Sequence, residues 1–159
     1  MASGRARVRV GVISDTHGLL RPEAIRAFRG VDLIVHAGDV GSADVLDRLR
    51  AVARVVAVRG NNDREAWARA LRERETFVAA GVRILVIHDV KELRAVPPPR
   101  GVRVVVAGHS HRPSIDERDG VLFLNPGSAG PRRFTLPVSV ATLTVRDGQP
   151  RARLVTLDA

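Results

Sequence analysis

Two histidines, His109 and His111, follow a run of valines and a glycine in the stretch VVVAGHSH. A second block, DTH, places Asp15 and His17 directly after the apolar run RVRVGVIS. Imidazole and carboxylate groups gathered in this way can bind divalent transition metals. A lone aspartate after a strand is more often a turn residue or a helix cap, and a lone histidine is more often packed near the core. The number of such blocks along the chain therefore decides between a metal site and these structural roles.

Three more polar blocks follow apolar runs along the chain. Asp39 stands in HAGDVG, Asn61 in RGNND and His88 in VIHD. In α/β sheets, ligands bind beyond the carboxyl ends of the strands. The joint pattern therefore predicts that two carboxylates, an amide and several imidazoles meet at one edge of a sheet. His36, inside LIVHAGD, is interpreted as a strand residue packed behind that site.

Apolar runs alternate with helical patterns in the first half of the chain, which predicts βαβ units and a mostly parallel sheet. The expected strands lie at 7–14, 31–38 and 54–60, and the expected helices at 21–30, 42–52 and 64–75. The second half is strand-rich, with strands expected within 76–88, 103–111, 114–125, 138–148 and 151–159. We expect an α/β fold in a single domain, 1–159, with two sheets packed together and helices outside.

The composition limits the class of protein. The absence of cysteine excludes disulfides and thiolate metal sites. No apolar stretch approaches the roughly 20 residues needed to cross a bilayer. The segment from Met1 to Asp15 lacks the apolar run of a signal peptide. We therefore expect a cytoplasmic protein without a membrane partner, and the sequence leaves a homo-oligomer open.

The charge is strongly positive, with 26 Lys and Arg against 17 Asp and Glu, a net charge of +9. Such a balance suits nucleic-acid binding. However, the arginines are scattered over every segment, and only 4 Phe and 1 Trp are available to stack on bases. A nucleic-acid partner is therefore disfavoured but left open. Binding that falls steeply with salt would support it.

The ordered blocks resemble the signature of the calcineurin-like metallophosphoesterase superfamily, D-x-H, G-D, G-N-x-D/E, H and G-H-x-H. Here they read DTH, GD, GNND, H and GHSH, between Val8 and about Ser128. The short length, GNND and the stretch NPGS at 125–128 are similar to a branch of small bacterial and archaeal phosphodiesterases, to which the retromer scaffold Vps29 is related. The resemblance implies a four-layer αββα sandwich, in which two mixed sheets are flanked by helices.

The resemblance also implies two divalent metal ions. One ion would take Asp15, His17, Asp39 and His111, and the other Asp39, Asn61, His88 and His109, so that Asp39 bridges the pair. Mn²⁺ is favoured, with Ni²⁺, Fe and Zn²⁺ as alternatives, because ligand type alone does not choose among them. The implied reaction is hydrolysis of a small-molecule phosphate ester by a metal-bridging hydroxide, with diesters favoured over monoesters. Asp39, Asn61 and His111 are the residues assigned to catalysis.

Two positions depart from the family pattern. Asn62 stands where many relatives have a histidine that assists the leaving group, so slow turnover of poor leaving groups is expected. Asp89 follows His88 where glycine is usual, and it would either hydrogen-bond a ligand histidine or narrow the cleft. Residues expected to orient a ligand or shape the wall of the site are Asp63, Asn125 and Ser128.

The alternative function is a metal-binding, non-catalytic interaction scaffold of the Vps29 type. That scaffold lacks the histidine of the D-x-H block, whereas His17 is present in this chain. All the predicted ligands are likewise in place. The enzyme is therefore the favoured interpretation.

Overall fold

The computed structural model describes residues 7–158. Met1–Ala6 and Ala159, which belong to the predicted domain 1–159 and, for Ala159, to the strand expected at 151–159, lie outside the described residues. The strands are β1 (Arg7–Ile13), β2 (Leu33–His36), β3 (Arg54–Ala57), β4 (Arg74–Ala79), β5 (Val82–Ile87), β6 (Val102–Val106), β7 (Ser114–Arg118), β8 (Val121–Asn125), β9 (Ser139–Arg146) and β10 (Gln149–Thr156). The helices are α1 (Pro22–Ala27), α2 (Ala43–Arg50) and the 3-10 helices η2 (Ala66–Ala70) and η3 (Val90–Arg94).

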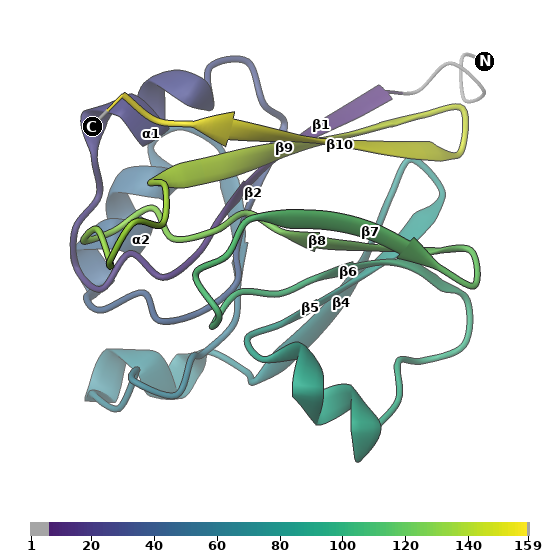
Figure 1. Ribbon diagram of the computed structural model, residues 1–159, viewed down its shortest axis with the longest axis horizontal. Helices are drawn as coiled ribbons and strands as arrows, with labels where there is room; N and C mark the ends of the chain where they lie inside the picture. The colour runs from purple at the N-terminus through teal and green to yellow at the C-terminus, as the bar shows by residue number, and fades with distance from the viewer. Residues whose placement is uncertain (1–6, 159) are drawn as a thin grey trace.

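The strands form two five-stranded mixed sheets (Figure 1). The first sheet has the order β10-β9-β1-β2-β3, and the second has the order β4-β5-β6-β8-β7. Strands β1, β2 and β3 are parallel, as are β5, β6 and β8. The remaining strands pair antiparallel at the edges. Each sheet thus contains a parallel set, whose carboxyl ends are the places where the polar blocks begin.

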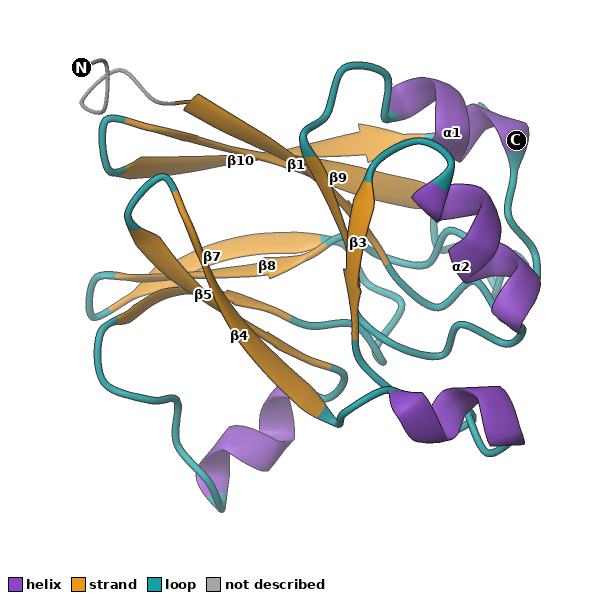
Figure 2. Cartoon of the chain, turned by 180° about the vertical axis from the view of Figure 1, so that it is seen from behind, coloured by secondary structure: helices purple, strands orange, loops and turns teal. Residues whose placement is uncertain are grey.

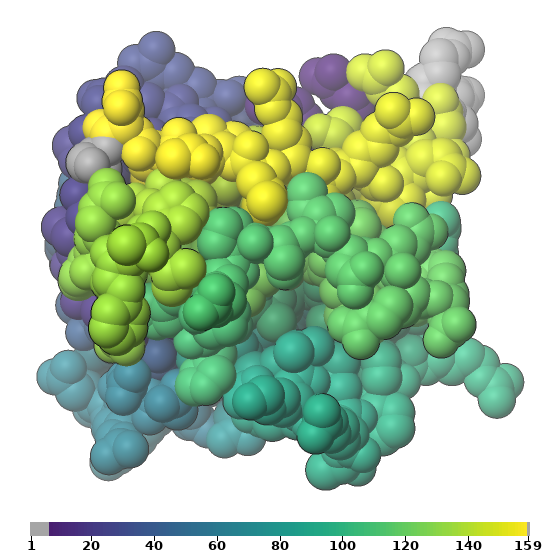
Figure 3. All heavy atoms as spheres, in the orientation of Figure 1, coloured from purple at the N-terminus to yellow at the C-terminus, as the bar shows by residue number. Residues whose placement is uncertain are grey.

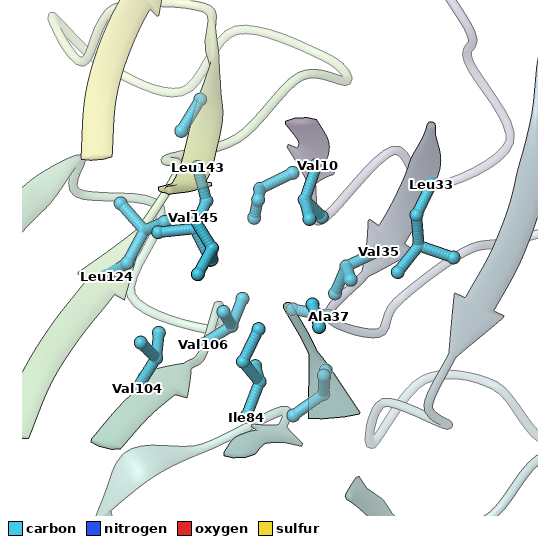
Figure 4. Close-up of a cluster of buried hydrophobic side chains, with 14 of the residues drawn as sticks. Val10, Leu33, Val35, Ala37, Ile84, Val104, Val106, Leu124, Leu143 and Val145 are labelled. Carbon is cyan, nitrogen blue, oxygen red and sulfur yellow. The ribbon is translucent and has the colours of Figure 1, made fainter. Parts of the chain in front are cut away.

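The two sheets pack face to face through branched apolar side chains. Val10 and Val35 of the first sheet meet Ile84, Val106 and Leu124 of the second, and all five side chains are almost completely buried (Figure 4). Valine and isoleucine suit strands that are covered on both faces. This core fixes the separation of the sheets and therefore the positions of the loops that leave them.

The outer faces of the two sheets are covered unequally. Helices α1 and α2 lie on the first sheet and pack Phe28 and Leu49 against Ile13 and Ile34 (Figure 2). Over the second sheet, η3 adds Leu93 to a smaller apolar cluster. The predicted arrangement of two mixed sheets flanked by helices is confirmed. Its outer layer on the second sheet is reduced to a short 3-10 helix.

The third predicted helix, at 64–75, is wrong. Its centre forms only the 3-10 helix η2, and its end becomes strand β4, which begins at Arg74. Arg72 also pairs with Val58 in a parallel bridge. Pairing with the sheets therefore outweighs the helix propensity of this Ala- and Arg-rich stretch. Within residues 7–158, no helix is long and apolar enough to span a membrane.

Candidate metal centre

The loops that leave β1 and β2 run side by side. The N–H of Asp15 donates to the carbonyl of Gly38 at 3.0 Å, and the N–H of His17 donates to the carbonyl of Asp39 at 3.0 Å. These bonds extend the parallel pairing of β1 and β2 beyond the ends of the strands. The side chains of Asp15, His17 and Asp39 are thereby brought together at one edge, as the sequence predicts.

The loop after β6 joins this site from the second sheet. The N–H of Gly108 donates to the carbonyl of His88 at 2.9 Å, and the N–H of His109 donates to Oδ2 of Asp15 at 3.1 Å. A Cβ atom at position 108 would overlap the side chains of Ser14 and Asp15. Only glycine allows the loop to approach this closely. Asp15 therefore connects the loops of the two sheets.

Five of the predicted ligands form two overlapping groups. Asp15, His17 and His111 make one group, and Asp15, Asp39 and His88 make the other, with ligand atoms all within 4.8 Å of one another in each. Oδ1 of Asp15 lies 3.5 Å from His111 Nε2 and 3.9 Å from His88 Nε2. Oδ2 of Asp39 lies 3.3 Å from His88 Nε2 and 3.9 Å from His17 Nε2.

Several buried polar atoms of this cluster have no hydrogen-bond partner. They are Asp15 Oδ1, His17 Nε2, His88 Nε2 and His111 Nδ1, and no other side-chain atom of residues 7–158 is both buried and unpaired. Leaving such a group unpaired costs about 1–3 kcal/mol, so native structures contain few of them. Carboxylate oxygens and imidazole nitrogens form a donor set for divalent transition metals. The cluster therefore fits metal ions, which would satisfy these atoms.

Five of the predicted ligands also have a left-handed backbone conformation. Their φ angles are 56° for Asp15, 47° for His17, 55° for Asp39, 70° for His109 and 64° for His111. Residues other than glycine rarely adopt this conformation, although Asp and His tolerate it better than most. Such strain concentrates at functional sites, where the direction of a side chain matters more than stability.

The other two predicted ligands, Asn61 and His109, lie on the exposed side of the cluster. Both line a cleft of about 150 Å³ together with His88 and Asp89. The His109 ring is 44% exposed, and its Nε2 lies 3.7 Å from Asp89 Oδ2. That distance is too long for a hydrogen bond. Of the two roles predicted for Asp89, the geometry favours narrowing of the cleft.

Side chains of the GNND block hold the loops together. Asp63 accepts hydrogen bonds of 2.9 to 3.1 Å from three backbone N–H groups, those of Val40, Gly41 and Gly60. Asn62 donates to both oxygens of Asp39, from its N–H at 2.9 Å and its amide at 3.1 Å. These bonds fit the orienting role predicted for Asp63, because they fix the loops that carry Asp39 and Asn61.

The NPGS stretch forms a wall of the site. The amide of Asn125 donates to the carbonyl of Gly108 at 3.0 Å. The hydroxyl of Ser128 donates to the carbonyl of Asp15 at 3.1 Å. Both bonds fit the expected role in shaping the site, because they hold the two ligand-bearing loops in place.

A chain of buried hydrogen bonds behind the cluster was not visible in the sequence. The N–H of Gly38 donates to Nδ1 of His36 at 3.1 Å, so Nε2 carries the ring hydrogen and donates to Thr16 Oγ1 at 3.0 Å. Thr16 in turn donates to the carbonyl of Val40 at 2.7 Å. Complete burial lowers the pKa of His36 to about 3. The packing of His36 behind the site is confirmed, and its neutral ring also connects the loops that carry Asp15 and Asp39.

The pKa values of the two aspartates of the cluster, Asp15 and Asp39, are shifted in opposite directions. Burial raises the pKa of Asp15 above its ordinary value. Burial alone would also raise the pKa of Asp39, but the contact with His88 and the hydrogen bond from Asn62 outweigh it, and this pKa lies below its ordinary value. Asp39 is therefore the carboxylate that stays ionised most readily, as a metal ligand must.

The histidines are also shifted by their surroundings. Burial alone would lower the pKa of His88, yet Asp39 and the carbonyl of Ala37, which accepts from Nδ1 at 2.7 Å, raise it to about 9. This bond leaves Nε2 of His88 as the atom that faces the carboxylates. Burial lowers the pKa of His111, and the positive charge of Arg133 adds to that effect. Arg133, which no sequence motif marks, therefore lies close enough to influence the site.

The fold and the buried Asp and His cluster define a metallophosphoesterase. The model of the calcineurin-like phosphoesterase superfamily domain matches residues 8–148. The chain belongs to this superfamily, and it is a hydrolase acting on phosphoester bonds.

Three curated relatives agree with this class. A "Probable metallophosphoesterase" of Methanothermobacter thermautotrophicus is 41% identical over 152 residues, covering 88% of this chain and 87% of the relative. Another "Probable metallophosphoesterase", from Methanocaldococcus jannaschii, is 38% identical over 162 residues, covering 94% and 81%. A "Phosphodiesterase" of the same organism is 29% identical over 138 residues, covering 76% and 83%.

Solved structures share the fold. An archaeal phosphodiesterase matches with a TM-score of 0.76 and 24% identity, covering 93% of this chain and 100% of its own. Vps29 of Entamoeba histolytica, complexed with Zn²⁺, matches with a TM-score of 0.70 and 25% identity, covering 94% and 99%. The fold is thus shared by a phosphodiesterase and by Vps29, so the site has to decide between the two functions.

Proposed function

We propose that the protein is a binuclear metal-dependent phosphoesterase acting on small-molecule phosphate esters, with diesters favoured over monoesters. The observation that supports this most is the cluster of buried, unpaired Asp and His atoms at the loops of both sheets. Asp15, His17, Asp39 and His111 would hold one ion, and Asp39, Asn61, His88 and His109 would hold the other. The phosphodiesterase among the relatives supports the preference for diesters.

Asp39 is the proposed shared ligand. Its Oδ2 lies 3.9 Å from a nitrogen of His17 and 3.3 Å from a nitrogen of His88, one residue from each set. Asp15 also reaches both groups, but its Oδ2 already accepts hydrogen bonds from Ser14 at 2.8 Å and from His109 at 3.1 Å. Within residues 7–158, each oxygen of Asp39 accepts only one hydrogen bond, both from Asn62, so each keeps a lone pair for a cation. In Asp15 only Oδ1 is free to bind, which suits a ligand of one ion.

The charge of the proposed site suits a phosphate ester. When bound, two divalent ions supply an activated water for in-line attack and offset the charge of the phosphoryl oxygens. Two aspartates against two divalent ions leave a net charge of about +2, since the imidazole and amide ligands are neutral. Asp39, Asn61 and His111 surround this positive site and are the proposed catalytic residues. Arg133 adds a further positive charge near His111.

The choice of leaving group is expected to depend on Asn62. Its amide donates to Oδ2 of Asp39 at 3.1 Å and cannot supply a proton at neutral pH. A general acid typically contributes about 10²- to 10⁴-fold. We therefore propose that the enzyme favours esters whose leaving groups need no proton, such as activated aryl phosphodiesters.

The test is hydrolysis of bis-p-nitrophenyl phosphate and p-nitrophenyl phosphate by metal-stripped protein after addition of Mn²⁺, Ni²⁺ or Zn²⁺. Asp44, exposed in the first turn of α2, supplies the control Asp44→Asn. Metal-dependent turnover that is lost in His17→Asn and kept in Asp44→Asn supports the proposal, and the ratio of the two rates separates diesters from monoesters. Absence of turnover with two ions bound would instead support a non-catalytic scaffold of the Vps29 type, which the shared fold allows.

A further inference from the structure

A groove opens on the outer face of the second sheet, where the helix layer is reduced. It lies between η3 and β7 and has a volume of about 640 Å³. Figures 1 and 3 show this sheet from its edge, with the green strand β7 towards the viewer and the teal η3 below it. The floor is apolar and consists of Val105, Ala107 and Phe123.

The groove shares a wall with the metal cleft. Asp89 and His109 line both of them. His109 belongs to the proposed second metal position, and Gly108 and Ser110 of the same loop continue the wall. A phosphate ester centred on the metal site can therefore extend one substituent past His109 into the groove.

The far end of the groove carries charge. The guanidinium of Arg118 lies over the Phe123 ring, 4.5 Å from its centre, and its Nε lies 3.1 Å from Asp116 Oδ2. An incoming ring would therefore lie on Val105 and Ala107, beside the Arg118–Phe123 pair. Lys91 of η3 also lines the groove. A flat ring matches an apolar floor, while its polar edge can meet the charged walls.

The dimensions of the floor also favour a ring over a helix of a protein partner. The step from Val105 to Ala107 covers two residues of extended chain, or about 6.6 Å at about 3.3 Å per residue. Phe123 pairs with Val105 on the neighbouring strand, about 4.8 Å away. An α-helix with its side chains is about 10 Å wide and would not reach this floor.

We propose that the groove binds a flat aromatic substituent of a phosphate ester whose phosphorus lies at the metal centre. This inference rests on the proposed function and narrows its substrate class to esters that carry an aryl or nucleobase ring. His109 then has two neighbours, the metal ion on one side and the ring on the other.

The experiment compares the binding of phenylphosphonate and methylphosphonate to the Zn²⁺-loaded protein by calorimetry. The two probes share the phosphonate group, and only one carries a ring. We expect phenylphosphonate to bind roughly tenfold more tightly, a ratio equivalent to 1.4 kcal/mol. Equal Kd values would overturn the proposal.

Two variants of strand β7 test whether the ring of phenylphosphonate lies in the groove. Ser114 lines the groove, whereas Glu117 is absent from its lining and lies on the opposite face of the same exposed strand. Ser114→Phe should abolish the advantage of the ring while leaving the Kd of methylphosphonate unchanged. Glu117→Phe should preserve the tenfold ratio. An advantage that survives Ser114→Phe would overturn the proposal.

Assays of p-nitrophenyl ester turnover separate failure of the groove proposal from failure of the proposed phosphoesterase function. Turnover combined with equal Kd values for the two phosphonates would overturn the groove assignment and leave the phosphoesterase function intact. A tenfold ratio that Ser114→Phe removes, combined with no turnover under any metal, would support the ring site and overturn the hydrolytic function.

Discussion

The two halves of the proposed metal centre differ in how far the protein builds them before an ion binds. The first half has ligand atoms within 4.8 Å of one another, on Asp15, His17 and His111. The second half combines the buried His88 with Asn61 and His109, whose side chains are exposed. The His109 ring is 44% exposed, compared with 7% for the side chain of His111.

This difference means that the two positions should differ in their affinity for metal. Ordering a side chain costs conformational entropy, so a position whose ligands are already fixed binds its ion more tightly. Binding of an ion at the second position would require the side chains of Asn61 and His109 to become ordered, because both line the exposed cleft. His109 also forms the wall of the ring-binding groove proposed above. We therefore expect the first position to fill at lower metal concentration and the second to respond to the substrate.

Asp39 belongs to both halves, so its loss should have the largest effect. Asp39→Asn removes the negative charge that lies near both His17 and His88. Residues that merely orient metal ligands contribute about 10- to 100-fold, so we expect kcat/KM to fall by more than about a hundredfold. Metal content should fall at both positions, as elemental analysis of the dialysed protein would measure. Wild-type turnover in this variant would refute the shared-ligand assignment.

Single histidine variants test the asymmetry between the halves. His17→Asn should weaken binding of the first ion by more than about a hundredfold, and His109→Asn should weaken only the second ion, by roughly tenfold. The smaller effect is expected because water can replace the exposed His109 ring. Calorimetric titration of Mn²⁺ into each variant resolves the two steps. Loss of the same step in both variants would contradict the asymmetry.

His36 should make the stability of the folded protein depend on pH, because its buried ring takes part in the hydrogen bonds behind the metal centre. Its pKa is about 3 in the folded protein and about 6.5 in an unfolded chain, so protonation favours unfolding. The stabilising contribution is complete above pH 6.5 and falls by about 1.4 kcal/mol per unit as pH drops towards 3. Urea unfolding of the metal-free protein between pH 7 and 5 measures this slope. His36→Gln should flatten it, and an unchanged slope would show that His36 does not control it.

The smallest expected effect concerns the leaving group. Asn62→His should accelerate hydrolysis of dialkyl phosphates by about tenfold, because an imidazole can donate the proton that the amide cannot. This is less than the roughly 10²- to 10⁴-fold of a general acid whose position the whole site supports. Turnover of bis-p-nitrophenyl phosphate, whose leaving group needs no proton, should change little. The ratio of the two rates is the measurement. Equal acceleration of both substrates would contradict the missing-acid explanation.

The strands were predictable because the local pattern and the fold agree. Runs such as VVVAG carry β-branched residues that suit a strand buried on both faces. The helix expected at 64–75 does not form, because there the local pattern and the fold disagree. Its residues favour a helix, but Arg72 pairs with Val58, and the residues from Arg74 onward form a hairpin with the following strand β5. The short helix η3 had no comparable signal.

The residue types around the metal centre were predictable, but the bonds that orient them were not. Spacing placed Asp15 and Asp39 at neighbouring strand ends, because parallel strands share an edge. Nothing in the sequence shows that Gly38 and Thr16 enclose a neutral His36 between them. The charge of Arg133 near His111 also arises from a loop whose path only the tertiary structure defines.

The central claim is that two ions share Asp39 at the meeting point of the two sheets. The most direct measurement is an anomalous-difference map from crystals of the protein grown with Mn²⁺. We predict two peaks, one beside Asp15, His17 and His111 and one beside His88 and His109, with Asp39 in contact with both. A single peak, or two peaks of which Asp39 contacts only one, would contradict the account.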